Sequence, residues 1–203
     1  MKHTQLTSVV AAIILNATAS FAATTEWAMP ADFNTIAEPP NHGVWSLGRC
    51  NVGAGDFAPY TEYAKTPQWK YWNFSDADVW ENGKAWLSFK PVFGTKAGEF
   101  VLHPGRGVDK GAALRWTAPA AGAYQVKGTY RGNAAGGDRD VVIRCGDKSI
   151  LDKKGTVSDE PFNFEVNVAQ GETLDFQVGN GSTWTVEATG FEVRITPAET
   201  NPS

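Results

Sequence analysis

Histidine is scarce in this chain of 203 residues, which contains three. Two of them, His42 and His103, lie beyond the N-terminal apolar run, each beside Pro or Gly in a predicted turn. Neither has a nucleophile elbow, an HExxH pattern or a Cys/His pair near it. We therefore expect structural or surface roles for both histidines and predict that the protein is not an enzyme.

Excess positive charge is also missing, since 18 basic side chains face 22 acidic ones and the formal net charge is −4. Proteins that bind polyanions depend on a positive surface, so we expect no nucleic-acid partner. Beyond the first 22 residues, no segment approaches the roughly 20 apolar residues that cross a bilayer. We therefore expect no membrane span.

The N-terminus has the features of an export signal. Its sequence, MKHTQLTSVVAAIILNATASFA, has Lys2 before an apolar run and ends in the small-residue pattern Ser20-Phe21-Ala22. These features predict a signal peptide over 1–22. We expect a secreted or periplasmic protein.

Only two cysteines are present, Cys50 and Cys145. An exported protein passes through an oxidising compartment, where a close pair usually becomes a disulfide. We therefore predict a Cys50–Cys145 bridge. The alternative is two separate buried thiols, because a bridge needs α-carbons within roughly 7 Å of each other.

Prolines and polarity divide the rest of the chain. Residues 23–42 show neither the helical nor the strand repeat of apolar residues, so we predict an N-terminal arm there. Residues 197–203 are predicted to form a polar tail. Between them, 43–196 predict a single β-sandwich domain with an aromatic-rich loop region at 60–86.

Alternation of apolar and polar residues gives the fold class. Strands recur about every ten residues and no segment has helical spacing, which favours an all-β, antiparallel two-sheet sandwich of jelly-roll type. The side chains expected to face the core are Tyr124, Val126, Tyr130, Val141, Ile143, Cys145, Phe162, Phe164, Val166, Val168, Leu174, Phe176, Val178, Phe191, Val193 and Ile195.

Aromatic residues carry the main functional signal. Five of the eight tryptophans lie between residues 43 and 92. Trp45, Trp86 and Trp116 occupy alternating contexts that predict burial. Trp69, Trp72 and Trp80 lie in irregular sequence beside charges, where an exposed ring can pack on a sugar face while polar groups orient its hydroxyls. The predicted ligand-binding residues are Trp69, Tyr71, Trp72, Asn73, Asp78 and Trp80.

Two acidic groups offer other chemistry. A glycoside hydrolase needs carboxylates roughly 5 to 9.5 Å apart, and Asp76, Asp78 and Glu81 are the candidates. Asp138 and Asp140, at a strand entrance, offer oxygen ligands for a structural calcium ion, although their spacing matches no EF-hand loop. No other metal and no cofactor is expected.

Four stretches resemble a family. They are NHGVWSLG (41–48), FVLHPG (100–105), LRWTAPAAGAYQVKG (114–128) and LDFQVGNG (174–181), and together they resemble a secreted bacterial β-sandwich domain found in exported PEP-CTERM-type proteins. The sequence after Ile195 lacks that family's Pro-Glu-Pro motif, membrane helix and basic end, so we expect release or periplasmic residence rather than anchoring. The C-terminal half is also similar to jelly-roll carbohydrate-binding modules, in which a P-x-x-G-x-Y-x-V strand precedes the ligand-supporting sheet.

These observations lead to one main hypothesis and two alternatives. The main hypothesis is a non-catalytic module that binds a polysaccharide or cell-surface glycan through exposed aromatics. The second is an envelope or extracellular-matrix module in which the same aromatics contact a protein. The third is a small glycan hydrolase.

Overall fold

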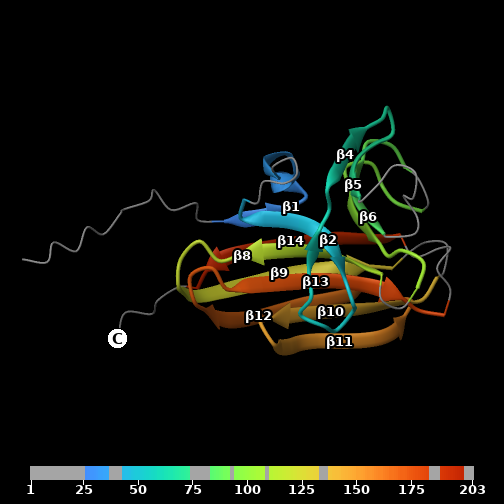
Figure 1. Cartoon of the computed structure of the whole chain (residues 1–203). Coiled ribbons are helices and arrows are strands. Elements are labelled where there is room, and N and C mark those ends of the chain that lie inside the picture. Colours follow the sequence, from blue (N-terminus) through green and yellow to red (C-terminus); the bar gives the residue numbers. More distant parts are fainter. Residues whose placement is uncertain are drawn as a thin grey trace, which may run out of the picture.

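The structure, a computed structural model, describes residues 26–36, 43–73, 83–91, 94–107, 110–132, 137–182 and 188–198, with the backbone alone at Thr35, Trp69, Trp72 and Asn73. These residues form two antiparallel β-sheets that pack face to face, which confirms the predicted all-β sandwich of jelly-roll type (Figure 1). A single 3₁₀ turn, η1 (Ala31–Thr35), interrupts the strands. Within the described ranges, no helix is long and apolar enough to cross a membrane.

The larger sheet has eight strands in the order β12-β9-β14-β7-β6-β5-β4, with β1 also paired to β14. Its strands are β1 (Trp27–Met29), β4 (Glu62–Lys65), β5 (Trp69–Asn73), β6 (Lys84–Ser88), β7 (Phe100–His103), β9 (Gly122–Arg131), β12 (Glu160–Val168) and β14 (Thr189–Pro197).

The smaller sheet has six strands in the order β11-β10-β13-β8-β2-β3. Its strands are β2 (Trp45–Cys50), β3 (Ala58–Pro59), β8 (Gly111–Thr117), β10 (Arg139–Cys145), β11 (Lys148–Thr156) and β13 (Thr173–Asn180).

The chain changes sheet repeatedly in its second half. The tight link at 118–121 carries it from β8 in the smaller sheet to β9 in the larger one. After the β10–β11 pair, each further strand lies in the opposite sheet from the strand before it. These crossings make the two layers interdependent, because every sheet is built from segments distant in sequence.

The core lies between the sheets and follows the predicted alternation. Phe162 and Phe191 of the larger sheet contact Phe176 of the smaller sheet, with ring centroids 5.9 and 5.2 Å from it. The hydroxyl of Tyr130 crosses the gap and donates to the carbonyl of Val142 at 3.0 Å, so this buried polar atom is satisfied. Trp45, Trp86 and Trp116 are buried as predicted.

One glycine in β9 allows two neighbours to approach closely. A Cβ at Gly128 would meet the ring of Phe162 and the backbone oxygen of Glu192 at less than van der Waals distance. Gly128 lies opposite Val193 of β14. Close packing of sheet and core therefore requires the absence of a side chain there.

The segment predicted as an N-terminal arm contributes to the sandwich over its described part, 26–36. Trp27–Met29 pairs with β14 through Ile195, Arg194 and Val193. Met29, Phe33 and Ile36 are buried in the main core. The sequence did not reveal this contribution, because a three-residue strand and a single turn are too short to show a repeat of apolar residues.

The last strands of the larger sheet extend beyond the stacked layers. Figure 1 shows β4, β5 and β6 rising at one end of the sandwich. They pair in sequence order, β4 with β5 and β5 with β6. This end carries the described part of the aromatic-rich region.

The structure corrects the expectation of a disulfide, because Cys50 and Cys145 are both free and buried. They lie on β2 and β10, which are separated by β8 and β13, so three strand spacings of about 4.8 Å lie between them. Cys145 belongs to the main core, whereas Cys50 has the opposite parity to the core residues Trp45 and Leu47 and lies on the other face of the sheet. Both the distance and the faces exclude a bond.

Burial determines the reactivity of these thiols. It raises the pKa of Cys50 far above its ordinary value and raises that of Cys145 to about 11, with the Glu172 carboxylate adding to the second effect. Since the thiolate is the reactive form, we expect a thiol-alkylating reagent to leave the native protein almost unmodified at pH 8. After unfolding without reductant, mass spectrometry should show two labels per chain. A chain that takes no label under those conditions would contradict the assignment.

Candidate functional site

The predicted ligand residues concentrate on β5, which lies between β4 and β6. Trp69 pairs with Ser88, Tyr71 with Trp86 and Trp72 with Ala85. Trp69, Tyr71 and Asn73 are therefore two residues apart along β5 and share one parity of the strand. Trp72 has the opposite parity.

The remaining predicted residues lie outside the described part of the chain. These are the ligand candidates Asp78 and Trp80 and the hydrolase candidates Asp76 and Glu81. Their assignments stay predictions.

A second, smaller core lies on the outer face of the larger sheet, where β5, β6 and β7 meet. Ala85 and Leu102 point into the main core, so their neighbours Trp86 and Val101 point to the opposite face. Trp86 and Val101 are fully buried there, and the half-buried Tyr71 packs against them. We call Tyr71, Lys84, Trp86, Val101 and His103 the outer cluster.

Lys84 is the unusual member of the outer cluster, because it is a charged residue with 1% of its surface exposed. Its Nζ lies 5.1 Å from the Trp86 ring centroid and 5.5 Å from that of Tyr71. The ring faces favour the charged ammonium, but burial opposes it and lowers the pKa of Lys84 to about 7. The net effect is a lysine that titrates near neutral pH, a property that the sequence alone does not reveal.

His103 lies directly opposite Lys84 at the end of β7. Burial is the main cause that lowers its pKa, to about 4, and the nearby Lys84 charge acts in the same direction. Its Nδ1 donates to the backbone oxygen of Pro104 at 2.6 Å. The imidazole is therefore neutral at physiological pH and fixed in one tautomer.

The hydroxyl groups next to the outer cluster are used internally. The indole Nε1 of Trp86 donates to Ser88 Oγ at 2.9 Å, and Ser88 Oγ lies 3.1 Å from Thr95 Oγ1. Ser88 thus bonds to an indole and a second hydroxyl, neither of which is a base that activates a nucleophile. This arrangement supports the packing of Trp86.

The calcium candidates hold adjacent loops together. The carboxylate of Asp138 accepts hydrogen bonds from the backbone N and the Oγ of Ser182, and these bonds lower the pKa of Asp138. Asp140 accepts from the backbone N of Gly155 at 2.9 Å and pairs with Lys154 at 3.3 Å. The described residues contain no group of three or more His, Cys, Asp or Glu side chains suited to a metal ion.

Part of the outer face of the smaller sheet is covered by the chain itself. Residues 51–57, which we call the strap, cross this face. Gln177 exchanges two hydrogen bonds with the strap backbone, at 2.8 and 2.9 Å. Arg115 forms a bidentate pair with Asp175 and lies 4.2 Å from the ring centroid of Phe57. The strap thus occupies the part of this face formed by β8 and β13, whereas most residues of β11 stay exposed.

Comparison with known proteins identifies no family. No family model and no curated protein matches the chain, so the resemblance to PEP-CTERM-type domains stays a prediction. The chain is an antiparallel β-sandwich by its own strand pairing.

Solved structures share parts of this architecture. A family 35 carbohydrate-binding module from Clostridium thermocellum is 15% identical, covers 58% of this chain and 89% of its own, and has a TM-score of 0.36. Pika GITRL is 13% identical, covers 44% and 79%, and has a TM-score of 0.33. A β-glucosidase from Kluyveromyces marxianus is 14% identical over 81% of this chain but only 18% of its own length, with a TM-score of 0.35. At these values the likenesses carry no argument about function.

The shifted pKa of Lys84 predicts a pH dependence of stability. Between pH 7 and 10.5 the unfolded chain keeps a proton on Lys84 that the folded chain has released. The free energy of unfolding should therefore rise with pH in this window, at up to about 1.4 kcal/mol per pH unit. Lys84→Met should remove this rise and should stabilise the protein most below pH 7.

Urea unfolding at several pH values between 6 and 10.5 measures this effect. Lys153→Met is the matched control, because Lys153 is exposed on β11. Equal pH slopes for wild type and Lys84→Met would contradict the low pKa of Lys84.

Proposed function

We propose that the protein is an exported, non-catalytic module that binds a polysaccharide or cell-surface glycan through the aromatic strand β5 and the residues that follow it. The observation that carries the proposal is the contrast between two paired residues. Trp86 has no exposed surface, whereas its cross-strand partner Tyr71 is half-buried. The other members of the outer cluster thus pack against Tyr71 and leave part of it accessible.

Sugar recognition fits the residue types at this position. The apolar face of a pyranose packs on an aromatic ring, and amide and carboxylate groups orient the hydroxyls. Trp69 and Asn73 share the register of Tyr71, and the predicted residues Asp78 and Trp80 follow on the same connection. No serine nucleophile is proposed here, because Ser88, the hydroxyl of β6, is bonded to Trp86 and Thr95. The carboxylate hydrolase with Asp76, Asp78 or Glu81 stays the alternative to binding.

The support for the site also favours a rigid platform. Lys84 lies against both Tyr71 and Trp86, so the aromatic pair and the cation form one packed unit. A ring held in this way loses little conformational freedom when a ligand packs on it.

Glycan-array and polysaccharide pull-down experiments test the proposal. Trp69→Ala, Trp72→Ala and Trp80→Ala should be compared with Ile150→Ala, which removes an exposed apolar side chain from β11 at the far edge of the smaller sheet. We expect Trp69→Ala and Trp80→Ala to weaken binding by about tenfold, because each loses a stacking contact, and Ile150→Ala to bind as wild type does.

Two results would overturn this assignment. One is a wild-type protein that binds no glycan, and the other is unchanged binding in both Trp69→Ala and Trp80→Ala. A stoichiometric protein partner, captured by crosslinking in the exported fraction, would instead support the protein-interaction alternative.

Export is the second part of the proposal and rests on the signal-peptide features of 1–22. Intact mass and N-terminal sequencing of protein from the medium or periplasm should show a chain that begins at Ala23. Replacement of Ala22 by a bulky residue, as in Ala22→Phe, should block cleavage and leave the longer chain with the membrane fraction. Full-length wild-type protein in the soluble cytoplasmic fraction would contradict export.

A further inference from the structure

The outer face of the larger sheet carries two cations directly opposite each other. Arg194 of β14 pairs in register with Lys127 of β9, and the next outward row pairs Glu192 with Thr129. Like charges directly opposite on adjacent strands repel each other. A position of this kind, on an exposed face of a protein with negative net charge, suggests a binding partner that is anionic.

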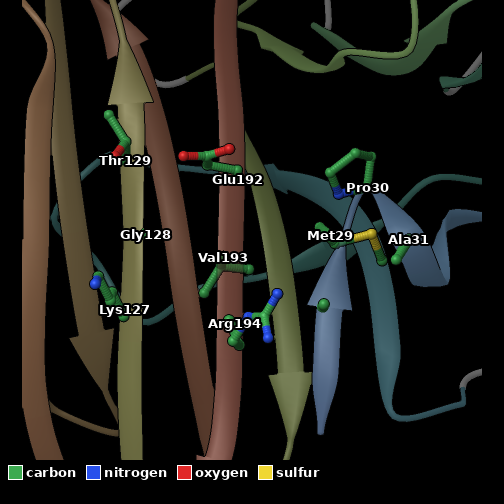
Figure 2. A pocket seen from close by; sticks show the side chains of 10 residues that line it. Met29, Pro30, Ala31, Lys127, Gly128, Thr129, Glu192, Val193 and Arg194 are labelled. Carbon is green, nitrogen blue, oxygen red and sulfur yellow. The ribbon is translucent and has the colours of Figure 1, made fainter.

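These residues line a hollow rather than a flat surface. Figure 2 shows Lys127, Thr129, Glu192 and Arg194 projecting from the two neighbouring strands, with the 28–31 segment beside them. The hollow has a volume of roughly 610 Å³, which is within the usual range for small-ligand sites.

The hollow continues along the sheet. A second depression shares Pro30 and Glu192 with it, and a third shares Lys96 and Arg131 with the second. We call the three together the sheet groove. Lys127 and Arg131 are four positions apart on β9, so the groove extends over at least about 13 Å, long enough for an extended chain.

The cations of the sheet groove differ in how they are paired. Arg131 pairs with Glu99, whose side chain is 8% exposed. Arg194 pairs with Glu26 at 2.7 Å, but both side chains are well exposed, at 64% and 38%, so this pair contributes little and exchanges readily. No ion pair joins Lys127, which is exposed, to any carboxylate in the described part of the chain. Lys96, which lines the second and third depressions, is also exposed and has no ion pair among the described residues. The available positive charge is therefore at Lys96 and at the Lys127–Arg194 row, and only this row has two cations directly opposite each other.

We propose that the sheet groove binds an anionic saccharide chain, with a carboxylate or sulfate of the sugar between Lys127 and Arg194. The charge pattern favours a saccharide over a uniform polyanion, because Glu192 and Glu99 interrupt the cations and would repel closely spaced charges. A sugar chain presents hydroxyl donors between its anionic groups, and these match the carboxylate of Glu192 and the hydroxyl of Thr129.

This inference rests on the proposed glycan-binding function and adds a second surface and a ligand class to it. The sheet groove involves β1, β9 and β14, whereas the site proposed around Trp69, Tyr71 and Asn73, here called the aromatic platform, lies on β5 and rests against β6. The effect on binding of variants in one surface can therefore be measured separately from the effect of variants in the other.

The test measures binding of the exported protein to four soluble polymers by isothermal titration calorimetry at 50 and 300 mM NaCl. The polymers are hyaluronate for carboxylate, keratan sulfate for sulfate, unmodified dextran as the neutral sugar and poly-L-glutamate as a carboxylate polymer without sugar. The double variant Lys127→Gln with Arg194→Gln is compared with Lys148→Gln with Lys153→Gln, which removes two exposed charges from β11.

We expect one anionic polysaccharide to bind with an affinity that falls at least tenfold in the groove variant, falls with salt and is unchanged in the β11 variant. The preferred polymer identifies carboxylate or sulfate as the ligand group. The inference is overturned if poly-L-glutamate binds as tightly as the anionic polysaccharide, if the two variants lose affinity equally, or if neither anionic polysaccharide binds. Array binding to neutral glycans that persists in the last case would leave the aromatic platform standing, whereas loss of all glycan binding would remove both proposals.

Discussion

Four aromatic rings, those of Tyr130, Phe162, Phe176 and Phe191, meet between the two sheets, and the positions of the surrounding strands depend on their contact. Three of them belong to the larger sheet and Phe176 to the smaller one. Burying such rings is the largest favourable contribution that a sandwich of this kind has available. Gly128 permits their approach, and the Tyr130 hydroxyl bonded to Val142 fixes the spacing of the sheets.

This central contact buries one face of each sheet, so each sheet has one outer face left. The strap covers the β8–β13 part of the outer face of the smaller sheet, and its backbone bonds to Gln177. The larger sheet divides its own outer face between the outer cluster, at the β5–β7 end, and the sheet groove, at the β9–β14 end. The larger sheet therefore carries both surfaces that are proposed to bind a ligand, the aromatic residues of β5 and the charged groove.

Charge and burial separate these two regions chemically. In the outer cluster, burial lowers the pKa values of Lys84 and His103. Near physiological pH, His103 is therefore neutral and Lys84 is partly neutral. In the sheet groove, exposure leaves the Lys127 and Arg194 charges in contact with water. One region is suited to packing on a ring, and the other to attracting an anion.

The sequence by itself determined the strand alternation, and hence the two-sheet sandwich and most of its core, because a strand with one buried face must place apolar residues at every second position. It also identified the concentration of aromatics now found on β5 and β6. The tertiary structure decided which strands are neighbours. The sequence could not show this, because the alternation of apolar and polar residues says which face of a strand is buried but not which strands pair with each other. The pairing of strands placed Cys50 and Cys145 on opposite faces of the smaller sheet with two strands between them. It also brought residues 26–36 into the core. On the outer face of the larger sheet it buried Lys84 beside Tyr71 and placed Arg194 opposite Lys127. Each of these depends on contacts between segments distant in the chain, which no local pattern of residues encodes.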